Sequence, residues 1–241
     1  MGSLVSERSG GKLVEYAFDI YLQCFVTVFS FYVALVLPFG ILEEFLQYSG
    51  AYKLSSVVLL LGILARYFAG IALTFLVSDI YLGNSPNLKY AISRITLRLF
   101  SKVLFTELLF EFIIVVCFFL LIVPSVIFYA WFMFGSVVAV LEGIWGIKAL
   151  KRSKDLGRNY YLRNLFVMFL PYSIYLLAKA VALYLLTKFS GPNWLWLSIG
   201  TALLLCLIEP VLIMRTVLLY YDMRIRQEAY DLVAMPEELK L

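Results

Sequence analysis

Residues 103–141 read VLFTELLFEFIIVVCFFLLIVPSVIFYAWFMFGSVVAVL, and only Glu107 and Glu111 interrupt this apolar run with charge. A single α-helix of these 39 residues would be about 58 Å long, because each residue adds about 1.5 Å. The hydrocarbon core of a bilayer is only about 30 Å thick. The chain must therefore turn back on itself inside this run.

We expect the turn at Pro124, because proline lacks a backbone N–H and breaks helices. It separates two segments of nearly spanning length, and we predict transmembrane helices over 101–123 and 125–142. A re-entrant hairpin is the alternative. Both arrangements leave the two ends of the run on the same side of the membrane.

The rest of the chain has the same apolar character. Of its 241 residues 63% are apolar and 15% are charged, whereas a soluble domain has about half and about a quarter. Four more segments are long and apolar enough to cross a bilayer, namely 23–46, 54–79, 163–187 and 194–220. We therefore predict an all-α polytopic membrane protein, one integral-membrane domain over residues 1–241 with six transmembrane helices in three hairpins.

The distribution of Lys and Arg predicts the orientation of these spans. Sixteen of the 20 Lys and Arg residues fall on one side of the predicted spans. The exceptions are Lys53 and Lys188 on the other side, and Arg66 and Lys179 within spans. Positively charged loops stay in the cytoplasm, so both termini and the two long loops should be cytoplasmic. An amphipathic basic segment precedes each hairpin, and we expect it to form a helix in the cytoplasmic headgroup layer. These segments are 12–22, 86–100 and 147–162.

Ionisable residues inside the spans cost about 2.5–3.5 kcal/mol each, so they should face the bundle interior and find partners. Matching their depths pairs Arg66 with Glu111 and Lys179 with Glu209. They form either a polar pathway for a proton, an ion or a headgroup, or ion pairs that hold helices or subunits together. The candidate buried charges, with Arg215 as a further internal partner, are Arg66, Glu107, Glu111, Lys179, Glu209 and Arg215.

Two cytoplasmic motifs are candidate contact sites. A basic strip between the fourth and fifth spans can bind anionic lipid headgroups or an acidic partner, or it only fixes the topology, and both roles can hold at once. This strip contains Lys148, Lys151, Arg152, Lys154 and Arg158. The C-terminal motif should fold against the cytoplasmic loops through ion pairs, or dock a soluble partner. This motif contains Tyr220, Tyr221, Asp222, Arg224, Arg226 and Glu228.

The residue types exclude several kinds of chemistry. The chain has no histidine, which removes the usual general base, the commonest metal ligand and the usual base of nucleophilic serine or cysteine sites. Cys24, Cys117 and Cys206 lie far apart, without a metal or disulfide pattern. We expect no catalytic residues, no metal, no cofactor and no nucleic-acid partner.

Three segments together resemble one bacterial family. They are Pro124 through Glu142, the basic run ALKRSKDL at 149–156 and the ending LYYDMRIRQEAYDL at 219–232. These are similar to the membrane domain attached to some glycerophosphodiester phosphodiesterases, which also occurs alone. The resemblance implies a six-helix protein of the bacterial cytoplasmic (inner) membrane. It does not imply phosphodiesterase activity, which belongs to a separate barrel domain that uses histidines and metal-binding carboxylates.

Three hypotheses for the function follow. The first is a non-catalytic accessory or scaffolding subunit that packs against other membrane proteins and lipids, which the 20 Phe and 17 Tyr residues favour. The second is a transporter or flippase for a lipid or small amphiphile, with the charges inside the spans as polar steps. The third is a membrane enzyme that acts at the headgroup level, which the lack of histidine disfavours.

Overall fold

The structure is a computed structural model that describes residues 10–120, 122–190 and 194–228. These residues are almost entirely helical and contain no β-strand, which confirms the all-α class. Their α-helices are α1 (Gly10–Gln23), α2 (Phe25–Tyr48), α3 (Tyr52–Tyr81), α4 (Leu88–Ser93), α5 (Leu97–Leu120), α6 (Ile122–Phe132), α7 (Gly135–Leu141), α8 (Ile147–Gly157), α9 (Tyr161–Ser190) and α10 (Trp194–Glu228).

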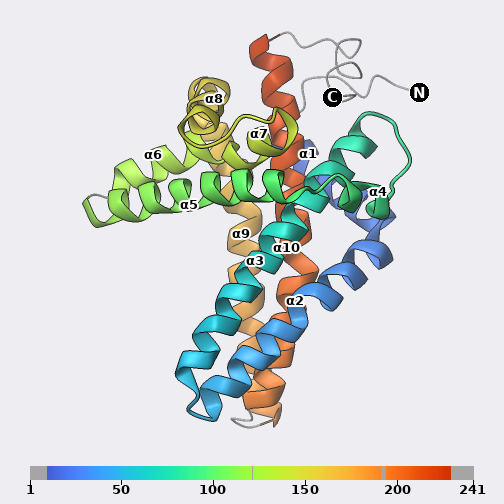
Figure 1. Cartoon of the computed structure of the whole chain (residues 1–241), viewed down its shortest axis with the longest axis vertical. Helices are drawn as coiled ribbons and strands as arrows, with labels where there is room; N and C mark the ends of the chain where they lie inside the picture. The colour runs from blue at the N-terminus through green and yellow to red at the C-terminus, as the bar shows by residue number, and fades with distance from the viewer. Residues whose placement is uncertain (1–9, 121, 191–193, 229–241) are drawn as a thin grey trace.

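The helices α2, α3, α9 and α10 form a bundle along the long axis of the molecule, and α10 packs against the other three (Figure 1). Large apolar side chains such as Phe45, Leu60 and Leu177 are exposed on this bundle. Within the residues that the structure describes, four segments are long and apolar enough to cross a membrane: Phe25–Tyr48, Tyr52–Tyr81, Pro124–Leu141 and Ile199–Glu228. Exposed apolar side chains on helices of this length are typical of a membrane protein, in which lipid covers them.

The helices α5 and α6 form a hairpin that runs across the long axis of the bundle (Figure 1). The first helix ends at Leu120 and the second begins at Ile122, so Pro124 lies in the first turn of α6, where proline is tolerated. The predicted span over 125–142 consists of two helices, because the chain breaks at Met133 and Phe134. With 11 residues, α6 is about 17 Å long.

A buried serine of α8 stabilises the break between α6 and α7. The Ser153 hydroxyl donates to the Trp131 carbonyl over 2.8 Å and accepts from the Phe134 N–H over 3.0 Å. Close to the break, a Cβ on Gly135 would lie 2.8 Å from the Leu150 Cδ2 of α8, so a larger residue here would require the Leu150 side chain to move. The two hydrogen bonds of Ser153 replace helical hydrogen bonds that the break removes.

The three predicted interfacial segments form helices, and two of these helices are shorter than predicted. The first segment corresponds to α1. The third, 147–162, corresponds to α8, which ends at Gly157 and is followed by a 3-10 turn at Arg158–Tyr160 and by α9. The second, 86–100, is divided between α4 and the start of α5. The Thr96 hydroxyl accepts from the Leu99 N–H over 3.2 Å and caps a new helix, α5, which starts at Leu97. Arg94, between the two helices, pairs with Asp79 at 3.2 Å and lies 4.0 Å above the ring of Phe75.

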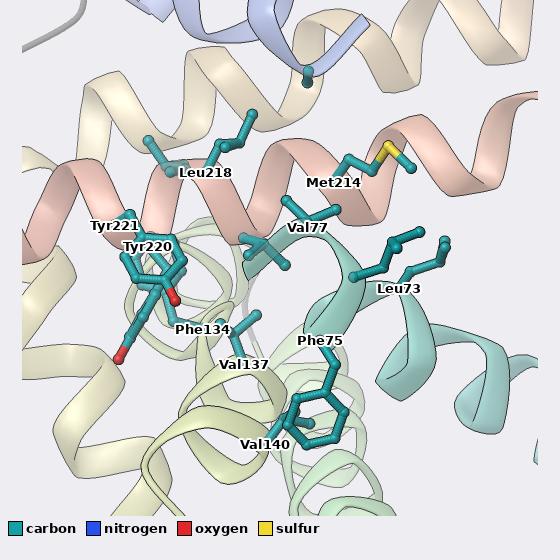
Figure 2. Packing of buried hydrophobic residues seen from close by; sticks show 14 of the residues in the cluster. Leu73, Phe75, Val77, Phe134, Val137, Val140, Met214, Leu218, Tyr220 and Tyr221 are labelled. Atoms are coloured by element: carbon teal, nitrogen blue, oxygen red, sulfur yellow. The ribbon is translucent and has the colours of Figure 1, made fainter. Parts of the chain in front are cut away.

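The core includes the region where α3, α7 and α10 meet, and it extends onto α1, α2, α8 and α9. Figure 2 shows Leu73, Phe75 and Val77 of α3 packed with residues of α7 and α10. Tyr221 is almost fully buried here, stacks on Tyr81 with 4.5 Å between ring centroids and forms a 2.7 Å hydrogen bond with the Ser78 hydroxyl. This end of the molecule is packed like a soluble core, whereas the other end of the bundle is mostly apolar surface.

Candidate functional site

A cavity of about 750 Å³ lies between the α5–α6 hairpin and the bundle, bordered by α3, α5, α6, α7, α9 and α10. Its walls bring together five of the six predicted buried charges, which come from helices far apart in the sequence. They are Arg66 of α3, Glu107 and Glu111 of α5, and Glu209 and Arg215 of α10. The sixth, Lys179, does not line the cavity.

The sequence predicted that these charged side chains are buried, but some of them are exposed. The side chain of Arg66 is 43% exposed and Glu111 is also exposed, while Glu107 and Glu209 are half-buried. Only Arg215, at 3%, is buried among the six. The cavity itself explains the difference, because side chains on its wall remain accessible within a space that a ligand, water or lipid can enter.

The predicted pairing of these charges is wrong. Arg66 pairs with Glu209, at 4.0 Å from Nε to Oε2, rather than with Glu111. Glu111 instead accepts a 2.6 Å hydrogen bond from the hydroxyl of Tyr67. Matching depths assumed that α5 lies parallel to α3, but α5 runs across it, so position along the chain does not translate into depth (Figure 1).

The two carboxylates of α5 are held by neutral groups. Glu107 and Glu111 are one turn apart and interact electrostatically, and the Ser136 hydroxyl is the hydrogen-bond partner of Glu107. Tyr67 is the partner of Glu111. Within the described part of the chain, neither carboxylate has an ion pair. Two negative charges therefore face the cavity without a cation against them.

Arg215 holds α10 to α9 through backbone carbonyls. Its guanidinium donates to the carbonyl of Val167 over 3.2 Å and to that of Met168 over 2.8 Å. In a regular helix the Val167 carbonyl would accept from the N–H of residue 171, but that residue is a proline. Arg215 thus supplies the donor that Pro171 lacks. Its buried Nε has no hydrogen-bond partner among the residues that the structure describes.

The remaining wall of the cavity is mostly apolar. Phe110 and Ile114 of α5, Phe132 of α6 and Met168 of α9 line it. Tyr129 of α6 interacts electrostatically with both Arg215 and Glu107, so a charge of each sign lies near it. The cavity thus combines charged groups of both signs with an apolar surface, which suits an amphipathic molecule.

The predicted basic strip is divided by the structure. Arg152 points to the chain's own carboxylates and forms ion pairs with Glu142, at 2.9 Å, and with Glu228. Burial alone would lower the pKa of Arg152, but the hydrogen bonds to Glu228 and Glu142 raise it above its ordinary value. Lys154 lies 4.4 Å above the ring of Trp131. The exposed basic residues that remain on the strip are Lys148, Lys151 and Arg158.

The C-terminal motif packs against the cytoplasmic elements through ion pairs. Asp222 pairs with Arg163 of α9 at 2.7 Å and with Arg226 at 2.9 Å. Arg224 pairs with Glu228 at 3.1 Å. Residues 229–232, the rest of the ending that carries the family resemblance, lie outside the described residues.

Glu142 is a central residue of this network that sequence reasoning missed. It accepts a 2.7 Å hydrogen bond from the Tyr220 hydroxyl in addition to the Arg152 ion pair. Its position at the end of an apolar run, directly before Gly143, is the one sequence signal that could have indicated it. Gly143, at a φ of +69°, lets the chain turn toward α8.

No cluster of His, Cys, Asp or Glu that could hold a metal ion occurs among residues 10–120, 122–190 and 194–228. Comparisons with protein-family models, with curated proteins and with solved structures found no match for this chain.

Proposed function

We propose that α2, α3, α9 and α10 cross the bilayer and that the α5–α6 hairpin lies along its cytoplasmic interface. The orientation of the hairpin across the bundle supports this (Figure 1). The apolar segment Pro124–Leu141 is long enough to span, but the break at Met133 and Phe134 divides it, and α6 alone covers about half of the hydrocarbon thickness. Four spans leave both termini on one side, as six would. The Lys and Arg distribution therefore still favours a cytoplasmic position for α1, α4 and α8.

Cysteine labelling tests this arrangement. In a variant without native cysteines, Lys53→Cys, in the first turn of α3, should react with a membrane-impermeant maleimide in intact cells. Asp155→Cys, on the exposed face of α8, should react only in inverted vesicles. Phe119→Cys, 83% exposed near the end of α5, should not be labelled from outside. Labelling of Phe119→Cys in intact cells would instead show that α5 crosses the membrane.

The cavity is the proposed binding site for a lipid or another amphiphile. The observation that carries this proposal is that charged residues of α3, α5 and α10 meet apolar walls in one space of about 750 Å³. Ligand sites have volumes of about 300–1,000 Å³ and are mostly apolar with a few polar groups. The polar groups suit a headgroup, and the apolar walls suit an acyl chain.

Movement of this amphiphile between leaflets is the proposed activity. Glu111→Gln should lower the rate of lipid movement by about tenfold, the effect of losing about 1.4 kcal/mol from one charged contact. The rate is measured with a fluorescent phospholipid and a membrane-impermeant quencher in vesicles that contain the purified protein. Glu44→Gln, on the exposed surface of α2, is the matched control and should keep the wild-type rate. Loss of the protein from the membrane would favour a structural role for Glu111.

An accessory subunit is the second candidate function. The observation that favours it is an apolar stripe on α5, where Phe105, Leu108, Phe112, Val115 and Phe119 are all at least half exposed. They recur at helical spacing on one face, so this face suits another membrane protein as well as lipid. Mass spectrometry of the proteins that co-purify in mild detergent tests this candidate. A protein that elutes alone as a monomer would contradict it.

The proposed location is the bacterial cytoplasmic membrane, and the proposed role is non-catalytic. The location depends on the family resemblance of the three segments quoted above, which stays a prediction. The non-catalytic role depends on the absence of histidine from the sequence. The exposed Lys148, Lys151 and Arg158 are the proposed contacts for anionic headgroups of the cytoplasmic leaflet.

A further inference from the structure

The charges on the cavity wall differ in how they are compensated. Arg66 and Glu209 lie opposite each other at 4.0 Å, so one positive and one negative charge balance. Arg215 contacts only neutral carbonyls in the described part of the chain, and its Nε has no partner. Glu107 and Glu111 contact neutral hydroxyls. The positive charge of Arg215 on α10 and the negative charges of Glu107 and Glu111 on α5 are therefore left uncompensated, and we call them the positive and the negative end of the cavity.

A buried guanidinium is costly unless an anion or several acceptors satisfy it. Arg215 is 3% exposed, and two carbonyls satisfy only part of its five N–H donors. An anionic group that enters the cavity would complete its hydrogen bonds. The same group would be repelled by Glu107 and Glu111 of α5, which also line the cavity.

A ligand that carries both charges meets both requirements. Building on the proposed amphiphile site, we infer that the cavity binds a zwitterionic phospholipid headgroup, with its phosphate at Arg215 and its ammonium at Glu107 and Glu111. Tyr129, which lines the cavity and interacts with both Arg215 and Glu107, would contact the part of the headgroup between its two charges. The apolar wall formed by Phe110, Ile114 and Met168 takes the upper part of the acyl chains.

The chemistry of the two ends predicts discrimination between lipids. A phosphoethanolamine headgroup has an ammonium group that donates to carboxylates. A phosphoglycerol headgroup has a net negative charge and no cation, so it leaves both carboxylates of α5 uncompensated. The site should therefore select the ethanolamine lipid, whereas an exposed basic surface such as α8 should select the anionic one.

Native mass spectrometry of the full chain tests this inference. The protein is placed in nanodiscs of equal parts dioleoyl phosphatidylethanolamine and dioleoyl phosphatidylglycerol and then transferred to mild detergent. The wild type should retain the ethanolamine lipid in about tenfold excess, which corresponds to about 1.4 kcal/mol of preference. Glu111→Gln, an exposed position where folding should be unaffected, and Glu107→Gln should each reduce this excess severalfold. Glu44→Gln should not change it.

Separate outcomes distinguish this inference from the proposed function. If the wild type retains no lipid, the amphiphile site itself is overturned. If it retains lipid with phosphatidylglycerol equal or in excess, only the zwitterionic headgroup is overturned, and the same holds if neither glutamine variant changes the ratio. Displacement of the lipid by millimolar phosphoethanolamine would support the zwitterionic site and assign it to a soluble ligand; resistance to displacement would assign it to the lipid.

Discussion

Replacing Arg152 with glutamine is expected to lower the Tm of the detergent-solubilised protein by about 6 °C. Arg152 connects α8 to the loop after α7 and to the end of α10, through Glu142 and Glu228. Glutamine of similar length removes the positive charge and leaves Glu142 with the Tyr220 hydroxyl and Glu228 with Arg224 as their partners among the described residues. Removing one partner of a largely buried pair costs about 2 kcal/mol, and each kcal/mol shifts Tm by about 2–4 °C at this chain length.

Lys151→Gln is the matched control, because Lys151 is the exposed neighbour of Arg152 on α8 and loses the same charge. Its Tm should change by about 1 °C or less, since isolated surface charges contribute little. Hydrogen exchange should localise the effect of Arg152→Gln to the last turns of α10, which the network holds in place. Equal changes in Tm for both variants would mean that net charge, rather than the ion-pair network, is responsible.

Hydropathy was sufficient to predict the long helices of the bundle. The segments 23–46 and 54–79 differ from α2 and α3 by about two residues at each end. Such agreement is expected, because a helix that lipid surrounds must be apolar along its length and must satisfy its backbone hydrogen bonds internally. Both properties depend only on the residues of the helix itself, so they can be predicted from a single sequence.

The same reasoning could not predict the break between α6 and α7 or the direction of the α5–α6 hairpin across the bundle (Figure 1). The proposed interfacial hairpin and a pair of spans would have nearly the same composition, and the difference lies in contacts with distant residues. Ser153 stabilises the break before α7, and the Thr106 hydroxyl accepts a 2.8 Å hydrogen bond from the Gly146 N–H. Neither contact has a sequence signal, because serine and threonine in apolar surroundings usually bond within their own helix.

The sequence predicts which charged residues belong to the candidate site, but it does not predict which of them form ion pairs with each other. The free-energy cost of placing a charge in an apolar segment is enough to identify Arg66, Glu107, Glu111 and Glu209 as candidates. Such residues usually have a structural or functional role that offsets this cost. Which of them meet depends on the orientation of α5 and on the faces that α3 and α10 present to each other. Arg215 illustrates this, because its partners are backbone carbonyls that a search for opposite charges does not consider.

Arg215→Met is expected to have the largest effect on stability, a loss of about 3 kcal/mol with a matching fall in membrane abundance. Methionine fills a similar volume but has no donor, so the Val167 carbonyl, which Pro171 already deprives of its helical partner, stays unsatisfied in an apolar region. The Met168 carbonyl is less affected, because residue 172 is not a proline and can supply its N–H.

A variant of Pro171 tests this explanation directly. Pro171→Ala restores an N–H for the Val167 carbonyl, so it should recover about 1–2 kcal/mol of the loss when combined with Arg215→Met. Thermal unfolding in detergent of the wild type, both single variants and the double variant forms the double-mutant cycle that measures this coupling. Pro38→Ala, which removes a proline from α2, is the matched control and should recover nothing. Strict additivity of Pro171→Ala and Arg215→Met would show that the arginine does not act as the missing donor of α9, and its cost would then come from packing alone.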